Sequence, residues 1–353
     1  MDLSTLPRDT PALKPPPGTT SNFDNPYNIK PEIYATVGVC LGVSTVLVWL
    51  RAYTKFVILK SHGWEDYYSF IAWAGLVAYA VLGLIASSYG SGVHQWDVRI
   101  HNFVTWAKLA NVMEIYYNPL IFITKLSILL QYIKIFAPSR TGKTYWSVHF
   151  LIWINLLFYI AVMLVQIMQC LPRAKIWNPT IPGRCVDIAN VLIVGAIINV
   201  VSDVSILVLP IHKVWHLQMP RNRKIGVSAV FMAGLFACIS SIVRMVGNVQ
   251  FARTEDLTFA LTPVALWTFA EVTSGILCGC LPVLPQFFRF YVPKWRQTLH
   301  LSPGNTSPGG SKTSYACRMA ALKDHKTHVQ DAPGADGRYI ELNNHKPPTD
   351  IRE

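Results

Sequence analysis

Five ionisable residues lie inside long apolar stretches of this 353-residue sequence, where a charge is costly. They are Glu114, Lys125, Asp203, Arg244 and Glu271. A charged group at membrane depth is usually paired, lines a polar cavity or belongs to a functional pathway. The three carboxylates can act as acids or bases, so Glu114, Asp203 and Glu271 are the candidate catalytic residues.

Position along each apolar stretch predicts which charges meet. At about 1.5 Å of rise per residue, Glu114, Arg244 and Glu271 lie in the outer half of the membrane, and Lys125 and Asp203 lie in the inner half. We therefore expect two ionic clusters, Arg244 with Glu271 or Glu114, and Lys125 with Asp203. Three amides are placed to extend the clusters: Asn118, Gln166 and Asn199.

Such clusters have two interpretations, and spacing alone does not choose between them. Either they line a polar cavity that binds a ligand or moves a proton, or they lock the helices together. We expect Pro119 to kink its helix and widen a cavity there. The candidate ligand-binding residues are Glu114, Asn118, Lys125, Asp203, Arg244 and Glu271.

Composition places these residues in a lipid bilayer. Hydrophobic residues make up 52% of the chain and charged residues only 14%, against about 25% charged residues in a soluble domain. Crossing the hydrocarbon core takes about 20 apolar residues, and seven stretches qualify: 33–53, 67–89, 107–136, 146–169, 188–212, 225–251 and 261–290. The predicted fold class is therefore all-α, a polytopic membrane protein with a bundle of seven transmembrane helices.

The two ends of the chain have a different composition. Residues 1–32 are polar and rich in proline, and residues 291–353 are rich in Gly, Ser, Pro and charges of both signs. Such segments cannot bury a core. We predict a disordered N-terminal tail outside, a membrane domain over 33–290, and a disordered cytoplasmic tail over 291–353.

Basic residues predict the orientation. The net charge of +12 does not indicate nucleic-acid binding, because most of the lysines and arginines lie at the ends of the predicted helices. The larger basic set includes Arg51, Lys134 and Lys224 and marks the cytoplasmic face. The N-terminus is then outside and the C-terminus inside, where loops and tail are available to a cytoplasmic partner. The sequence leaves open the plasma membrane or an endomembrane.

Two of the seven cysteines are candidates for a disulfide. Cys170 and Cys185 flank a loop that the charge pattern places outside, in an oxidising compartment. His94, Asp97 and His101 offer metal-ligand side chains in another outer loop, but a polar loop packed on the bundle explains them as well, so we predict no metal site.

Several absences narrow the function. Residues 261–288 contain no lysine, which excludes a retinal Schiff base of the usual seventh-helix kind, so no cofactor is expected. The third span ends Gln131-Tyr132-Ile133-Lys134 and lacks the acidic-Arg-aromatic triplet of common G-protein-coupled receptors. No Walker loop indicates ATP-driven transport.

Several short stretches, taken together, resemble the fungal rhodopsin-like domain family, which includes the integral membrane protein of the satratoxin toxin cluster. The matching stretches are 63–67, 89–94, 124–130, 135–136, 169–170, Trp177, Cys185, Asp203, 209–211, 241–244, Glu271 and 280–282. Glu65 stands where the family usually has a second Asp, which preserves the charge. The resemblance implies seven helices, an outside N-terminus, a fungal source and association with secondary-metabolite gene clusters, and it implies no settled activity.

Three functions remain as hypotheses. The first is a receptor-like protein that binds a small lipophilic ligand in the helical cavity. The second is an intramembrane acid–base cyclase or isomerase acting on a lipophilic pathway intermediate. The third is a metabolite carrier, which the lack of visible repeat symmetry disfavours.

Overall fold

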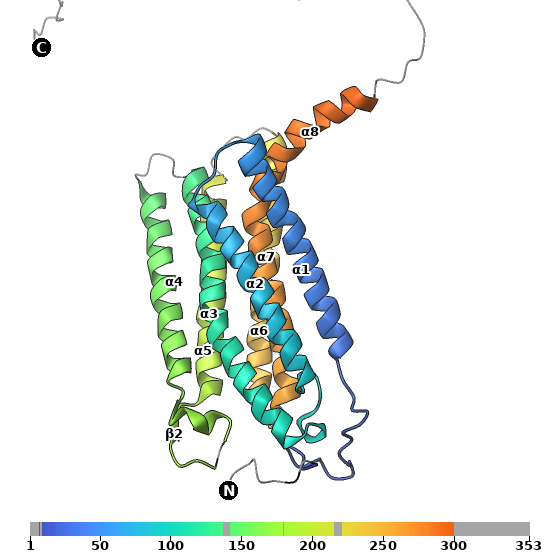
Figure 1. The fold of residues 1–353 in the computed structure, drawn as a ribbon. Helices are drawn as coiled ribbons and strands as arrows, with labels where there is room; N and C mark the ends of the chain where they lie inside the picture. The colour runs from blue at the N-terminus through green and yellow to red at the C-terminus, as the bar shows by residue number, and fades with distance from the viewer. Residues whose placement is uncertain (1–6, 8, 137–141, 179, 215–220, 300–353) are drawn as a thin grey trace, which may run out of the picture. The chain divides into compact units, whose positions relative to one another are not determined.

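The fold is a bundle of long helices (Figure 1). It is a computed structural model, and it describes residues 7, 9–136, 142–178, 180–214 and 221–299. The helices are α1 Lys30–Tyr53, α2 Trp64–Ser88, α3 Ile100–Phe136, α4 Lys143–Ile167, α5 Ile188–Val214, α6 Arg221–Phe251, α7 Leu257–Cys280 and α8 Leu284–Leu299. Within the described residues, seven helices are long and apolar enough to cross a membrane, which confirms the predicted fold class.

Most of the membrane-spanning helices begin a few residues before the predicted apolar stretches, because polar residues start a helix that hydropathy does not detect. Thus α3 begins at Ile100 rather than near residue 107, through a first turn that contains His101 and Asn102. It runs through Pro119 as one helix. At the start of α2, the Asp66 Oδ2 atom accepts the Gly63 N–H at 3.0 Å, a carboxylate cap that fits the positive end of the helix dipole.

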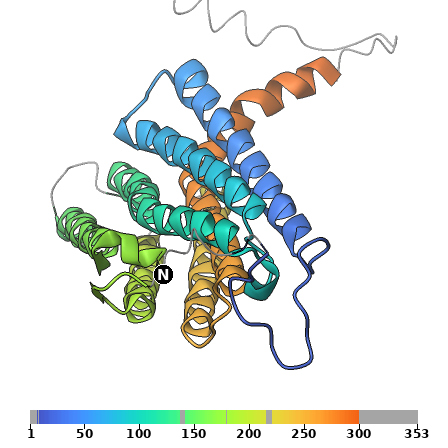
Figure 2. The ribbon, with the colours of Figure 1, turned by 60° about the horizontal axis from the view of Figure 1, so that its bottom comes forward.

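Helices α3 and α7 form the interior of the bundle. Helix α7 packs against α1, α2, α3 and α6, and α3 also packs against α4 and α5 (Figures 1 and 2). In the most apolar window of each span, 67% of the residues in the span that contains α7 are buried, against 17% in α4. Three of the five central ionisable residues lie on these two interior helices: Glu114 and Lys125 on α3, and Glu271 on α7.

A short hairpin closes the loop between α4 and α5. Strands β1 Cys170–Leu171 and β2 Arg184–Cys185 pair antiparallel, with Cys170 opposite Cys185. A disulfide joins these two cysteines, which confirms the predicted bridge.

The described part of the N-terminal segment is more ordered than its composition predicts. It runs beside the loop after α2, where Pro11 and Asn28 make backbone bridges to Arg99 and Val93 (Figure 2). The Asn22 N–H also donates to Asp97 Oδ1 at 2.8 Å. These partners are distant in sequence, so local composition could not indicate them.

Helicity also continues past residue 290. Helix α8 reaches Leu299, and the Tyr53 and Tyr291 hydroxyl groups lie 2.6 Å apart. The remainder of the predicted tail, residues 300–353, lies outside the described residues.

Candidate functional site

The predicted inner ion pair is present. Lys125 Nζ lies 2.8 Å from Asp203 Oδ1, which confirms that α3 and α5 meet through these charges. The ammonium group also donates to Asn199 Oδ1 at 2.9 Å and to Ser202 Oγ at 3.2 Å. The surrounding acceptors satisfy Lys125, which is 3% exposed.

Of the two predicted partners of Arg244, Glu271 forms the ion pair and Glu114 does not. Arg244 Nε lies 2.8 Å from Glu271 Oε2, and the Tyr117 hydroxyl donates to the same carboxylate oxygen at 3.2 Å. The Arg244 guanidinium also lies over the Tyr117 ring, 4.6 Å from its centroid. A cation above an aromatic face gains further electrostatic attraction.

The two pairs form one network rather than two separate clusters. The Asn199 Nδ2 amide donates to Glu271 Oε1 at 2.5 Å and to Asp203 Oδ2 at 3.2 Å. Its Oδ1 atom accepts from Lys125 and from the Tyr159 hydroxyl. One amide on α5 thereby connects the two ion pairs, because its side chain reaches both carboxylates.

The other two predicted amides contact each other. Asn118 Nδ2 donates to Gln166 Oε1 at 2.6 Å and to the backbone oxygen of Glu114 at 3.0 Å. This contact joins α3 to α4. Among the described side chains no hydrogen bond connects it to the Asn199 network, so Asn118 and Gln166 do not extend the ion pairs as expected.

A cavity of about 90 Å³, named here the outer cavity after the predicted orientation, lies between α1, α2, α3, α6 and α7, toward the end of the bundle where α3 and α7 begin. A buried water needs roughly 10–15 Å³ of such space, so several waters or part of a small organic molecule can enter. Aromatic and aliphatic side chains form most of the wall, including Tyr79, Trp106, Met113, Leu261 and Phe269.

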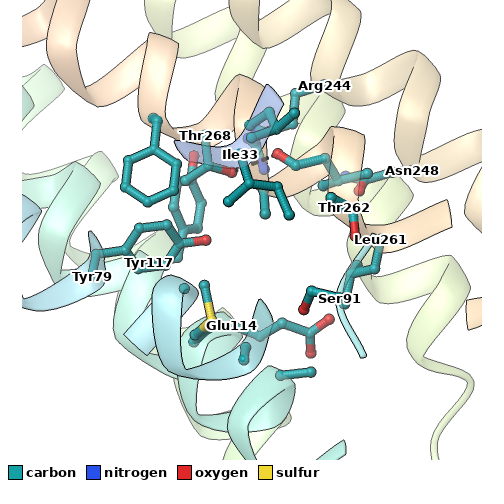
Figure 3. A pocket seen from close by; sticks show the side chains of 18 of the residues that line it. Ile33, Tyr79, Ser91, Glu114, Tyr117, Arg244, Asn248, Leu261, Thr262 and Thr268 are labelled. Atoms are coloured by element: carbon teal, nitrogen blue, oxygen red, sulfur yellow. Dashed lines mark hydrogen bonds between the residues drawn. The ribbon is translucent and has the colours of Figure 1, made fainter. Parts of the chain in front are cut away.

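A few polar groups interrupt this apolar wall. Figure 3 shows Glu114 and Ser91 on one side of the cavity and Arg244 and Asn248 on the opposite side. Glu114 belongs to none of the ion pairs formed by the described residues. Of the three candidate acid–base residues, it is therefore the carboxylate that faces free space without a cation.

Asn248 is a site residue that sequence reasoning missed. Its side chain is 1% exposed, and its Oδ1 atom has no hydrogen-bond partner among the described residues. Its place one helical turn after Arg244 on α6 was a signal in the sequence, because residues four apart share a helix face.

A second cavity of about 30 Å³ lies deeper, between α3, α5, α6 and α7. Lys125, Asp203 and Glu271 line it together with the small residues Gly234 and Gly275. The Glu271 carboxylate thus borders this inner cavity while it holds Arg244 at the wall of the outer one.

A further polar cluster lies at the end of the bundle that carries α8. Arg51 and Asp66, both 1% exposed, form an ion pair at 2.7 Å. Arg51 also donates to Gln131 Oε1 at 2.8 Å and to the Gly279 backbone oxygen, which ties α1 to α2, α3 and α7. Sequence reasoning used Arg51 only as a loop charge, because it lies at the end of the first span.

The loop between α2 and α3 holds its ionisable residues by contacts within the protein. His94 Nδ1 lies 2.6 Å from Asp256 Oδ2, and the His94 ring stacks between Trp96 and Phe259 at centroid distances of 4.4 and 4.2 Å. The Asp97 carboxylate accepts a hydrogen bond from the backbone N–H of Asn22 in the N-terminal segment. Among the described residues no three His, Cys, Asp or Glu side chains are grouped to hold a metal ion.

Comparison with known proteins identifies the family. The model of the fungal rhodopsin domain matches residues 50–290. The chain belongs to the fungal rhodopsin domain family. The match covers α2 to α7 and includes every residue of the Asn199 network, which confirms the family resemblance of the sequence motifs. No solved structure matches this fungal rhodopsin domain protein.

Relatives of this fungal rhodopsin domain protein are fungal. It is 46% identical over 245 residues to a SAT4 family membrane protein of Emericella nidulans, covering 69% of the present chain and 59% of the relative. It therefore spans about three fifths of that relative's length. It is 30% identical to the fugralins biosynthesis cluster protein 2 of Gibberella zeae, covering 81% and 73% of the two chains. It is 24% identical to the receptor GIN3 of Arthrobotrys oligospora, covering 80% and 68%.

Proposed function

We propose that this protein binds a small lipophilic molecule in the outer cavity and acts in a receptor-like way within a secondary-metabolite pathway. The observation that carries the proposal is the combination of free volume, an apolar wall and polar groups without protein partners. Ligand pockets are typically apolar with a few placed polar groups that fix orientation.

The hydrogen-bond network supports a receptor-like role. Arg244 lines the outer cavity, Glu271 holds Arg244, and Asn199 connects Glu271 to Lys125 and Asp203 in the inner half. A ligand that draws the Arg244 guanidinium toward itself changes the balance of these contacts. Coupling then requires two arrangements of the network with different ligand affinity.

The comparisons support the biological setting. The named relatives include a protein of the fugralins biosynthesis cluster and the receptor GIN3. The first fits association with a metabolite pathway, and the second fits ligand sensing.

The proposed orientation places the N-terminus outside and the C-terminus in the cytoplasm. The disulfide between Cys170 and Cys185 supports it, because disulfides persist in oxidising compartments. The N-terminal segment contacts the loop after α2, and the basic residues Lys55 and Lys134 lie at the opposite end. A cytoplasmic partner would then contact the basic loops and the tail.

A capture experiment tests the proposal with the ligand still unidentified. Protein purified from a fungal host is denatured, and the released small molecules are identified by mass spectrometry. Ala110 lines the cavity on α3, whereas Val112 on the same helix is 47% exposed. Wild type and Val112→Phe should release the same lipophilic compound, and Ala110→Phe should release much less. Equal release from all three proteins, or none from wild type, contradicts the proposal.

A second candidate is an intramembrane acid–base enzyme. The specific observation is the Glu114 carboxylate, which faces the cavity without an ion-pair partner among the described residues. Asp203 and Glu271 are less suited, because each carboxylate already pairs with a cation and accepts a hydrogen bond from the Asn199 amide. Microsomes should then convert a pathway intermediate, and Glu114→Gln should abolish the conversion; unchanged turnover would exclude this role.

Deleting the gene separates the candidates in one measurement. An accumulated precursor indicates the enzyme, lost induction of the pathway indicates the receptor, and lost secretion indicates a metabolite carrier.

A further inference from the structure

Arg244 and Asn248 present two complementary hydrogen-bonding groups to the cavity. They lie one turn apart on α6, and both line the wall (Figure 3). The two residues are 6% and 1% exposed. Residues four apart on a helix are neighbours on one face, so a single ligand group can reach both.

The Asn248 side chain has an unused acceptor. Its Nδ2 group donates to the Leu192 backbone oxygen at 3.4 Å, while its Oδ1 atom has no partner among the described residues. Because a buried acceptor without a donor is costly, a ligand donor at this position is favoured.

Arg244 offers the opposite chemistry. Its Nε edge faces Glu271, and its plane covers the Tyr117 ring. No hydrogen bond from its two Nη groups is found among the described residues, so these N–H groups are available to a ligand acceptor. The Glu271 carboxylate already balances the charge of Arg244 at 2.8 Å.

From these contacts we infer that the ligand is a neutral lipophilic molecule with a carbonyl group beside an N–H or O–H group, as in an amide, a lactam or a hydroxyketone. The carbonyl oxygen accepts from the Arg244 Nη groups, and the adjacent donor bonds to Asn248 Oδ1. This assignment rests on the proposed function and defines the chemical class of its ligand.

Charged alternatives fit less well. A ligand carboxylate would add a second negative charge beside the neutral Arg244–Glu271 pair and offer no donor to Asn248. An alkylammonium bound at Arg244 and Asn248 would meet the guanidinium with like charge, and the Glu114 carboxylate that could pair with it lies on the opposite side of the cavity (Figure 3). Burying an uncompensated charge is strongly unfavourable, so the wall formed by Arg244 and Asn248 selects neutral groups.

Four eight-carbon probes test the chemical class. Full-length protein in nanodiscs is titrated with octanamide, methyl heptanoate, octanoate and octylamine, and saturable shifts of the thermal unfolding midpoint give the Kd. Octanamide supplies both acceptor and donor, and the ester supplies only the acceptor. We expect octanamide to bind on the order of tenfold more tightly than the ester, with the two charged probes weaker still.

Two variants of α6 test whether the preference for octanamide over the ester comes from the Asn248 side chain. Asn248→Leu removes the acceptor, and the ratio of ester to amide Kd should fall to about one. Gln250 is an exposed amide two residues along the same helix, and Gln250→Leu should keep the wild-type ratio. An unchanged ratio in Asn248→Leu, or a ratio lost equally in both variants, overturns the assignment.

The outcomes separate this inference from the proposed function. Tightest binding of the carboxylate or the amine, or equal binding of amide and ester, overturns the ligand class. If that binding is lost in Ala110→Phe and kept in Val112→Phe, the outer cavity still binds lipophilic ligands and the proposed function stands. If no probe binds wild type saturably, or all bind Ala110→Phe normally, the ligand assignment fails; only the capture experiment then decides the proposed function.

Discussion

The outer cavity and the Arg51 cluster both bury charged residues, but they differ in how those charges are satisfied. In the Arg51 cluster, the guanidinium contacts Asp66, Gln131 and the Gly279 carbonyl. In the outer cavity, the Glu114 carboxylate and the Asn248 oxygen face free volume without such partners among the described residues. Burial alone therefore does not mark a functional site in this bundle; an unsatisfied polar group next to free space does.

This contrast predicts that the largest loss of stability comes from the Arg51 cluster. Arg51→Met leaves the Asp66 carboxylate buried without its cation. Removing one partner of a buried ion pair costs about 3–5 kcal/mol. We expect the free energy of unfolding, measured with denaturant in detergent micelles, to fall by that amount, or the protein to be retained misfolded in cells.

A double variant is the control for this prediction. Arg51→Met combined with Asp66→Leu removes both charges, and apolar replacement of a complete buried pair is often neutral. Stability should therefore recover in large part. A single variant that is as stable as wild type would show that the cluster does not hold α1, α2, α3 and α7 together.

A smaller loss of stability than that of Arg51→Met is expected when a carboxylate of the central network is replaced, and a still smaller one when Glu114 is replaced. Glu271 forms an ion pair with Arg244 and accepts hydrogen bonds from Tyr117 and Asn199. Glu271→Gln breaks this buried pair, and the loss of one partner costs about 3–5 kcal/mol, but the new amide oxygen can still accept one of the two hydrogen bonds. The free energy of unfolding should therefore fall by about 3 kcal/mol, the lower end of that range. Glu114→Gln removes no ion pair among the described residues and should change it by less than about 1 kcal/mol.

Thermal unfolding of Glu271→Gln and Glu114→Gln measures how much stability each variant loses relative to wild type. Each replaces a carboxylate with an amide of the same size on an interior helix, so differences in helix propensity are small. If Glu114→Gln is the more damaging of the two, Glu114 has a structural partner, and its proposed role at the cavity loses its basis.

The pairing of charged residues in the site could be predicted in large part from their depth in the membrane. The Lys125–Asp203 pair could be predicted, and the partner of Arg244 could be narrowed to Glu271 or Glu114, because rise along a helix converts residue number into depth. The fold class was predictable because each membrane span is a continuous apolar stretch of the sequence.

The unpredicted part depends on how each helix is rotated about its axis. One sequence does not show which face of α5 turns inward, so the role of Asn199 as the bridge between both pairs was not visible. Rotation of α6 likewise decides that Asn248 faces the cavity. The contacts of the N-terminal segment with Asp97 and Val93 depend on distant loops, which composition cannot reveal.

The smallest effect is expected from an ion pair of the same chemical type as Arg51–Asp66. Arg99 Nε lies 3.3 Å from Asp9 Oδ1, but these side chains are 44% and 77% exposed. Solvent and salt screen such pairs, which contribute about 0.2–1 kcal/mol. Arg99→Gln should therefore change the free energy of unfolding by less than about 1 kcal/mol, and the change should shrink as salt is added. A loss comparable to that of Arg51→Met would mean that the N-terminal segment unfolds together with the bundle, because only a cooperative unit transmits the loss of so exposed a contact.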